Sequence, residues 1–405
     1  MKSITALLLG ATITLTFLIS ACSSSGSPTS DSNPATGNTS GSPASAASTC
    51  DPDGPTSTDP AVAAGQAALK KAVTPSTTWD GPASGPKAQT RGATVVFVPQ
   101  LSSNAGDLGV ENGLKEAATA IGWNLKVIDG GGTTANNLAA LEQAIALKPA
   151  GIVLSSFDPK AAAADFAKAK SAGIPIVANH TGTEPGPPSG ATGLFTNVTS
   201  DPATIAKIAA ACAIVASGGK AGVTIVGCGT EVEICQTKED AMVNEIKSCS
   251  GCTVLAHEDY AFENASQREG SIAAADYQKF GSRLTYMLSI NDIYYDAAIP
   301  ALRALGVAQS GPPLMIAAGD GSPTAFDRIR EGEYQIATVA EPLNEHGWQL
   351  ADELNRAIAN QQPTSFVTYP HLVTKANVDL EGGKNNTYDP DNGYRQHYKQ
   401  IWGVS

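Results

Sequence analysis

Short polar side chains recur at the points where strand-like segments of this sequence end. The loop after the first such segment contains four of them: Ser102, Ser103, Asn104 and Asp107. Two more, Asn291 and Asp320, directly follow later apolar segments. Hydroxyl, amide and carboxylate groups that converge on one space can hold a small polar molecule by hydrogen bonds. Ser, Asn and Asp also cap helices, and Asp107 suits either role, whereas the strand-exit positions of Asn291 and Asp320 favour ligand contact.

Two series of alternating strand and helix patterns must position these residues. The strand-like segments of the first series are 93–98, 125–128, 151–155, 174–178 and 194–196. Those of the second series are 223–226, 253–256, 284–289, 313–318 and 334–339. Helical patterns lie between them, including 294–305 and 323–331. The alternation predicts an α/β protein with two Rossmann-like lobes, each with a parallel sheet whose strand ends face a shared cleft.

The N-terminus carries the features of an export signal. Lys2 precedes an apolar stretch at 4–19, and the segment 18–22, LISAC, is similar to the lipobox of bacterial lipoproteins. The stretch is shorter than the roughly 20 residues that span a bilayer. We therefore expect removal of residues 1–21 as a signal peptide and lipidation of Cys22, which anchors the chain to the cell membrane on its extracytoplasmic side. An ordinary secretory signal or a short anchor is the alternative.

Residues 22–88 lead from this anchor to the folded body. The part up to about position 58 is rich in Ser, Thr, Gly and Pro and almost lacks bulky apolar side chains. Such a segment cannot bury enough surface to offset its chain entropy, so it predicts a flexible tether. A short helix is expected at 61–73, before the folded body begins.

Composition and missing motifs argue against other classes of protein. The net charge is −12, and the 26 basic residues form no cluster, which argues against nucleic acid as a partner. The sequence contains no G-x-S-x-G elbow, no H-E-x-x-H pair and no phosphate-binding P-loop. We therefore expect a protein that is not an enzyme and that uses no cofactor and no metal.

Six of the seven cysteines follow Cys22. In an oxidising compartment they are expected to form disulfides, with Cys228 paired to Cys235 and Cys249 paired to Cys252 as the first choice. Four cysteines allow three connectivities, and a zinc site is the alternative. Cys212 lies on an apolar helical segment and is most simply a core residue. Cys50, in the tether, could reach Cys212 or stay free.

Five segments together resemble the type I periplasmic sugar-binding proteins, the ribose and galactose binding family that serves ABC importers. They are the first strand with its loop, VIDGGGTTANNLAALEQAIALKPAGIVLSS at 127–156, IPIVANHTG at 174–182, LSINDIYYDAAIPALRALG at 288–306 and MIAAGDGSPTAFDRIREGEYQIATVAEP at 315–342. Their order and spacing follow the family over roughly residues 90–378. The long linker and the WDGP segment look like actinobacterial lipoprotein members.

The resemblance implies a set of ligand contacts. Asn291 and Asp320 match the family positions that bond sugar hydroxyls, Glu341 matches a position that is often Gln, and Asn179 and His180 stand where Asp and Arg are common. Gln236 lies near the place of a missing family arginine. The full set expected to bind ligand is Ser102, Ser103, Asn104, Asp107, Phe157, Asn179, His180, Asn197, Gln236, Phe262, Asn291, Asp320 and Glu341.

The expected ligand is a small polar molecule. No arginine falls on a predicted strand end, and carboxylate or phosphate ligands usually call for a guanidinium group. A monosaccharide or a polyol therefore fits best, and a cationic amine or a small aromatic compound is the alternative. The loop 102–107 lacks the aromatic side chains on which ribose-type members stack their sugar. The candidates for that apolar face are Phe157, Phe195, Tyr260, Phe262 and Tyr294, with Trp79 as a further alternative.

The resemblance also implies a hinge and a partner. Three segments near 197–200, 340–342 and 366–371 are expected to join an N-terminal lobe, 89–197 plus 342–366, to a C-terminal lobe, 198–341 plus 367–378. Hinge closure on the ligand would present a monomeric protein to an ABC transporter permease. A ligand-sensing receptor without transport is the alternative. The tail, 379–405, is expected to pack on one lobe through Tyr394, Tyr398 and Trp402.

Overall fold

The computed structural model describes residues 49–54, 57–189, 193–229, 232–260 and 264–405. The predicted signal peptide, the predicted lipidation site Cys22 and most of the predicted tether lie outside these ranges. The described residues belong to a single unit of the chain, Ser45–Ser405. Within them, no helix is both long enough and apolar enough to cross a membrane.

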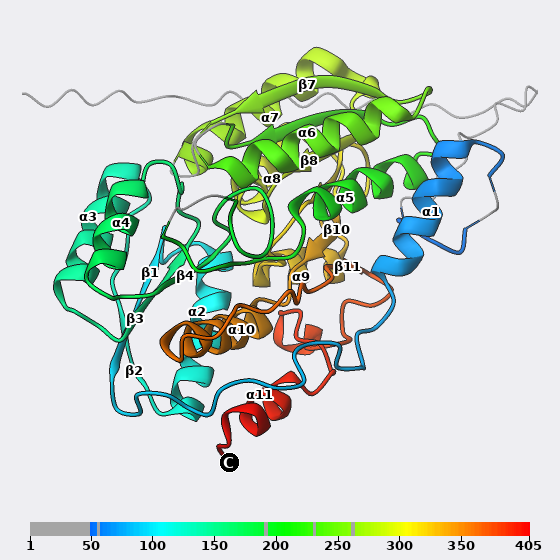
Figure 1. Cartoon of the computed structure of the whole chain (residues 1–405). Coiled ribbons are helices and arrows are strands. Elements are labelled where there is room, and N and C mark those ends of the chain that lie inside the picture. The colour runs from blue at the N-terminus through cyan, green and yellow to red at the C-terminus, as the bar shows by residue number, and fades with distance from the viewer. Residues whose placement is uncertain (1–48, 55–56, 190–192, 230–231, 261–263) are drawn as a thin grey trace, which may run out of the picture. The chain divides into compact units, whose positions relative to one another are not determined.

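The first lobe is built on a parallel sheet with the strand order β2-β1-β3-β4-β5 (Figure 1). Its strands are β1 (Thr94–Pro99), β2 (Asn124–Val127), β3 (Gly151–Ser155), β4 (Ile176–Asn179) and β5 (Asn197–Val198). Helices cover both faces: α2 (Ala105–Ile121) and α10 (Leu343–Ile358) on one, α3 (Thr134–Ala146) and α4 (Ala163–Ser171) on the other. Because alternate residues such as Val95 and Val96 point to opposite covered faces, β1, β3 and β4 are largely apolar, whereas the edge strand β2 exposes Asn124 and Lys126.

The second lobe contains a six-stranded sheet with the order β11-β10-β9-β8-β6-β7. Its strands are β6 (Gly222–Gly227), β7 (Thr253–Asp259), β8 (Tyr286–Ser289), β9 (Leu314–Ala317), β10 (Gln335–Ala340) and β11 (His371–Thr374). Its helices are α5 (Pro202–Ala216), α6 (Glu233–Ser248), α7 (Ala265–Phe280), α8 (Tyr295–Ala304) and α9 (Pro323–Glu331), with short 3-10 turns at Gly281–Arg283 and Asp292–Tyr294. Only β11 pairs antiparallel among the described strands. The predicted class, α/β with two parallel-dominated sheets, is confirmed.

Two local predictions need correction. The strand expected at 194–196 begins instead at Asn197, although the N–H of Phe195 already bonds to Ile176. Gly193, whose φ is +82°, precedes this segment, and the ladder with β4 starts only after the turn. β11 was not predicted as a strand, because four residues that return antiparallel at a sheet edge carry little apolar pattern.

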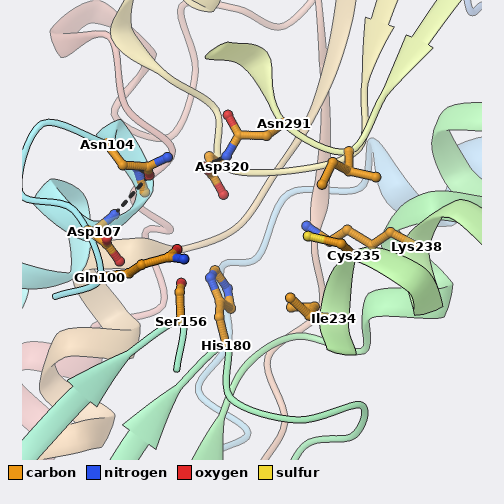
Figure 2. A pocket seen from close by; sticks show the side chains of 12 residues that line it. Gln100, Asn104, Asp107, Ser156, His180, Ile234, Cys235, Lys238, Asn291 and Asp320 are labelled. Carbon is orange, nitrogen blue, oxygen red and sulfur yellow. Dashed lines mark hydrogen bonds between the residues drawn. The ribbon is translucent and has the colours of Figure 1, made fainter. Parts of the chain in front are cut away.

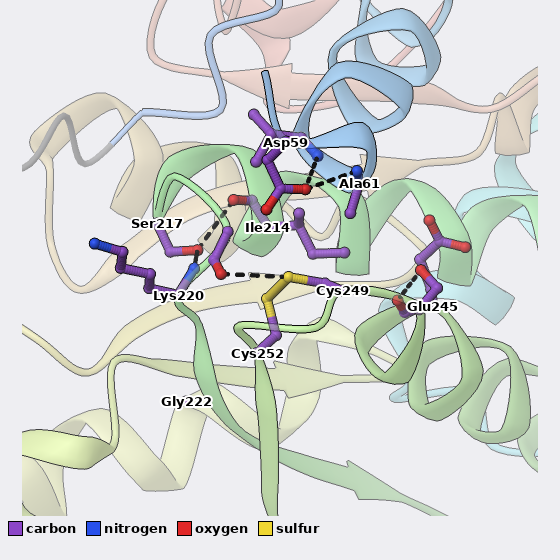
Figure 3. The surroundings of a disulfide bond; sticks show 12 residues. Asp59, Ala61, Ile214, Ser217, Lys220, Gly222, Glu245, Cys249 and Cys252 are labelled. Carbon is purple, nitrogen blue, oxygen red and sulfur yellow. Dashed lines mark hydrogen bonds between the residues drawn. A yellow bond between two sulfur atoms is a disulfide. The ribbon is translucent and has the colours of Figure 1, made fainter. Parts of the chain in front are cut away.

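Three disulfides lie in the second lobe and its N-terminal approach. Cys228 joins Cys235, and Cys249 joins Cys252, which are the pairs favoured by the sequence. The Cys249–Cys252 bond lies beside the turn that connects α5 to β6, close to the start of α1 (Pro60–Ala72) at Asp59 (Figure 3).

The third disulfide joins Cys50 to Cys212 of α5. Cys50 is only 3 % exposed. The folded part of the chain therefore already includes Cys50, and the predicted tether ends before it and not near position 58. Cys212 is buried as expected, but its role as a simple core residue is corrected to that of a covalent anchor. Helix α1, which follows, packs against α5 with Val62, Leu69 and Ala72 in the core of the second lobe.

The chain crosses between the two sheets three times: after β5, between β10 and α10, and between α10 and β11. After β11 the tail forms a 3-10 turn at Gly383–Asn385 and the helix α11 (Tyr394–Trp402). The ring of Trp402 stacks on Trp348 of α10 with the centroids 5.5 Å apart, and Tyr394 and Tyr398 are buried in the same cluster. The tail therefore completes the core of the first lobe.

Candidate functional site

A small cavity lies where the carboxyl ends of both sheets face each other (Figure 2). Its volume is about 40 Å³. The lining residues come from both lobes: Gln100, Asn104, Gly106, Asp107, Ser156, His180, Ile234, Cys235, Lys238, Ile290, Asn291 and Asp320. Figure 2 shows the side chains of the first lobe and those of the second lobe pointing toward one common space.

Asn291 and Asp320 form one part of the wall that the second lobe contributes. Asn291 follows β8, its side-chain oxygen accepts a hydrogen bond from Ile293 N–H at 2.9 Å, and its amide donates to the Asp320 carboxylate. Asp320 has a φ of +63° between Gly319 and Gly321, a left-handed conformation that Asp tolerates better than most residues.

A second carboxylate, that of Asp292, holds the turn at Asp320 by hydrogen bonds to its backbone. Asp292 is fully buried and accepts hydrogen bonds from the N–H groups of Gly321 at 3.0 Å and Ser322 at 2.9 Å. Its other oxygen accepts from Gln335 at 2.7 Å. Burial raises the pKa of Asp292 to about 6, against the lowering effect of these hydrogen bonds. Asp292 is therefore a positioning residue for Asp320.

Asp107 and Asn104 form the facing wall of the first lobe. Asn104 is the N-cap of α2, and its side chain accepts from Gly106 N–H at 2.8 Å. Asp107 lies in the first turn, where it accepts from Ser155 Oγ at 2.5 Å and Leu101 N–H at 3.0 Å. Burial raises the pKa of Asp107 to about 7. Of the two roles expected for Asp107, capping falls to Asn104, and Asp107 lines the cavity.

His180 connects the cavity to the crossings between the lobes. Its Nε2 lies 3.1 Å from the Glu341 carboxylate, which also accepts from Ser200 N–H at 3.3 Å and lies 3.8 Å from Lys238 Nζ. Burial lowers the pKa of His180, but the charge and hydrogen bond of Glu341 outweigh this effect and raise it. Burial raises the pKa of Glu341, yet His180 and Lys238 hold it well below its usual range.

The same network reaches the third crossing. The Ser200 hydroxyl lies 2.8 Å from the Thr368 hydroxyl, which is 2.7 Å from His346 Nε2. Ser200 follows the first crossing strand, Glu341 lies in the second crossing and Thr368 in the third. Buried side chains thus link all three crossings to a residue that lines the cavity.

The arrangement matches a known family. Residues 95–362 match the profile of the periplasmic binding protein domain. The chain belongs to the periplasmic binding protein family. This family comprises non-enzymatic solute-binding proteins, the class that the sequence motifs indicated. No curated protein matches the chain.

Solved structures of other periplasmic binding proteins share this fold. An ABC transporter solute-binding protein from Agrobacterium vitis with bound allitol is 21% identical, with a TM-score of 0.62 over 73% of this chain and 99% of that one. A second from the same organism, bound with alpha-D-tagatopyranose, is 21% identical with a TM-score of 0.65 over the same shares. A glucose-galactose binding protein from Geobacillus stearothermophilus is 18% identical, with a TM-score of 0.63 over 72% and 100%.

Five of the predicted contacts line the cavity of this periplasmic binding protein: Asn104, Asp107, His180, Asn291 and Asp320. Glu341 lies directly behind His180. The structure places six others away from the cavity lining: Ser102, Ser103, Phe157, Asn179, Asn197 and Gln236. Phe262 lies outside the described residues.

Several of these side chains are engaged in holding the fold. Phe157 is 2 % exposed and packs in the core between the sheet and α3 and α4. Asn179 donates to the carbonyl of Val198 at 2.6 Å, and Asn197 accepts from Thr181 N–H at 2.9 Å. Gln236 turns toward Asp240 on its own helix. Polar residues near strand ends can therefore serve the backbone and not the cavity.

The sequence did not identify seven of the lining residues: Gln100, Gly106, Ser156, Ile234, Cys235, Lys238 and Ile290. Lys238 matters most, because it brings an ammonium group to a cavity that was expected to be acidic. Gly106 allows the lobes to approach, since a Cβ there would lie 2.6 Å from the Asp320 carboxylate. The one signal in the sequence was the position of Lys238, near the place of the missing family arginine.

Proposed function

We propose that this protein captures a neutral polyhydroxylated solute, a monosaccharide or a polyol, in the cavity between its lobes. The observation that supports this is the mixture of hydrogen-bonding groups around one small space. Asp107 and Asp320 accept from hydroxyls, Lys238 donates, and the amide of Asn291 does both. A hydroxyl group also donates and accepts, so a molecule with several hydroxyls can satisfy this set.

The electrostatics favour a neutral ligand over a charged one. Lys238 and His180 face the same space as Asp107 and Asp320, so positive and negative groups are balanced there. Burial raises the pKa of Asp107 to about 7, which reduces the negative charge available for a cationic amine. Among the residues that the structure describes, no arginine lines the cavity, so none of them offers a guanidinium group to a carboxylate or phosphate.

The size of the cavity supports a mechanism of opening and closure. A volume of about 40 Å³ accommodates only a few water-sized groups, since one water needs roughly 10–15 Å³. A sugar can enter only when the lobes separate, and the three crossings are the segments about which they can rotate. A ligand bonded to both Asp107 and Asp320 stabilises the closed state by its differential affinity.

The site of action follows from the predicted N-terminus. Cleavage before Cys22 and acylation of this residue would tether the protein to the outer face of the cell membrane, and the closed form would deliver its solute to an ABC transporter permease. A monomer suffices for this role, because the cavity is formed by the two lobes of one chain.

The proposal is tested by a binding screen on the mature protein. Calorimetry and thermal shift against aldoses, ketoses, polyols, amino acids and amines should give binding by a sugar or polyol, since a ligand of the folded state raises the melting temperature. Lys238→Met should weaken this binding, and the matched exposed variant Lys247→Met on the same helix should not. Tight binding of an amine or an amino acid, with none by any sugar or polyol, would refute the assignment.

A further inference from the structure

Three potential metal ligands converge on the second lobe, outside the cavity. Glu239 extends from α6, and His257 and Asp259 extend from β7. His257 Nε2 lies 2.9 Å from Glu239 Oε2 and 3.2 Å from Asp259 Oδ1. One ligand atom from each residue lies within 4.8 Å of the other two. No metal motif is visible in the sequence, because Glu239 is separated from His257 and Asp259 by much of α6 and β7.

The local structure fixes each of the three side chains. His257 and Asp259 are two positions apart on a strand, so both point to the same face of the sheet. Glu239 accepts a hydrogen bond from Gly229 N–H at 2.8 Å through Oε1, which leaves Oε2 directed at His257. Gly227 provides the space, since a Cβ there would collide with the Glu239 carboxylate. Such outer hydrogen bonds typically orient metal ligands.

Among the described residues, His257 is the only basic side chain paired with Glu239 and Asp259, so at most one positive charge faces two carboxylates. Glu239 is fully buried, and buried carboxylates are normally paired. Among the described residues, no lysine or arginine forms an ion pair with Glu239 or Asp259. Both carboxylates instead approach the same nitrogen of His257, which carries at most one hydrogen. A cation between the three groups would satisfy all of them at once.

We propose that Glu239, His257 and Asp259 form a binding site for a divalent transition metal ion, with Zn²⁺ as the best match. An imidazole nitrogen favours zinc over calcium or magnesium, which prefer oxygen ligands alone. Around tetrahedral zinc, with bonds of about 2.0–2.2 Å, ligand atoms lie roughly 3.3 Å apart. The observed 2.9 and 3.2 Å are close to this spacing. His257 and Asp259 are partly exposed, so an ion can enter from solvent.

A bound ion would brace the wall of the cavity. Helix α6 carries Glu239 into the metal group and Cys235 and Lys238 into the cavity lining. The ion would join this helix to β7, at the edge of the sheet, and to the backbone at Gly229. The proposed metal site is therefore structural, and metal binding there does not depend on which solute the cavity binds.

Equilibrium dialysis of the chelator-treated mature protein, free of any histidine tag, tests the site. We expect one Zn²⁺ per chain and a rise in melting temperature with zinc, but none with Ca²⁺ or Mg²⁺. Asp259→Asn should weaken zinc binding by at least the roughly 10–100-fold that loss of an outer-shell partner costs, and His257→Gln should remove it. Asp259 is largely exposed, so its variant should fold. Glu258→Gln is the matched control, because that side chain points to the opposite face of β7.

Three outcomes would overturn the inference. The first is the absence of stoichiometric zinc in the wild-type protein. The second is zinc binding that His257→Gln leaves unchanged. The third is binding that His346→Gln removes and His257→Gln does not, because it would move the ion to the buried group of His180, Glu341 and His346. Failure of the sugar screen would leave this result unaffected, so the two proposals fail separately.

Discussion

Replacing Glu341 with glutamine should destabilise the folded protein by about 3–5 kcal/mol at neutral pH, the usual cost of breaking a buried ion pair. Glu341 is 1 % exposed and lies 3.1 Å from His180 Nε2 and 3.8 Å from Lys238 Nζ. At an effective dielectric constant of about 20, these charges attract by about 5 and about 4 kcal/mol before desolvation is counted. Glutamine would leave His180 and Lys238 buried without their anion.

The effect should depend on pH in a defined direction. Because the pKa of His180 is raised in the folded state, its protonation contributes stability that is complete below its unfolded pKa of about 6.5 and is lost as the pH rises through the folded value. The pKa of Glu341 is lowered, so its contribution persists above about 4.5 and is lost only in strong acid. The difference in the free energy of unfolding between the wild-type protein and Glu341→Gln should therefore decrease as the pH rises above the folded pKa of His180.

Glu345 provides the control. It is also buried, four residues along the chain, but burial raises its pKa to about 8, so the acid is largely protonated at neutral pH. Glutamine resembles a neutral carboxylic acid and can still accept from Asn392, so Glu345→Gln should cost less than about 1 kcal/mol. Urea unfolding of both variants between pH 6 and 9 decides the matter. If both substitutions lowered the free energy of unfolding equally, the conclusion that Glu341 is charged and Glu345 is neutral would be refuted.

Three further substitutions test the site and the fold. Asp320→Asn should weaken binding of the solute identified by the screen by roughly tenfold or more, measured by calorimetry, whereas the exposed Asp327→Asn should not. Trp402→Ala should cost about 3–5 kcal/mol in urea unfolding, because a buried ring that completes the first core is removed. Replacing Cys50 and Cys212 together with serine should cost about 2–5 kcal/mol, seen as a lower melting temperature.

Elements with local signals at both ends could be predicted closely from the sequence. β3 is confirmed at Gly151–Ser155 and α9 at Pro323–Glu331, where Ser322 caps the helix and Gly332 ends it in a left-handed conformation. β5 and β11 were missed or shifted because very short strands at a sheet edge depend on pairing partners that are distant in sequence. Their positions are decided by tertiary contacts and not by local pattern.

The candidate site shows the same division. Asn291 and Asp320 were identified because they follow strands whose carboxyl ends must meet at the cleft. Lys238 was not identified, because it reaches the cavity from the second turn of α6, a helix that the Cys228–Cys235 disulfide joins to the end of β6. Asn179 was assigned to the ligand, but its amide holds β5 to β4. Strand ends supply polar groups, and only the three-dimensional contacts show which of them are free to bind.

The segments outside the family match also connect the two lobes. The N-terminal approach is fixed to the second lobe by the Cys50–Cys212 bond and by α1, and its carbonyls at Ser84 and Pro86 accept hydrogen bonds from α10 of the first lobe. The tail bonds to α9 through Gly383 and then packs α11 on α10. The N-terminal approach and the tail therefore add two chain connections between the lobes to the three crossings of the hinge. If the lobes open as proposed, the hydrogen bonds of Arg330 to Gly383 and of Arg356 to Ser84 oppose their separation, so we expect a smaller opening angle than the hinge alone would allow.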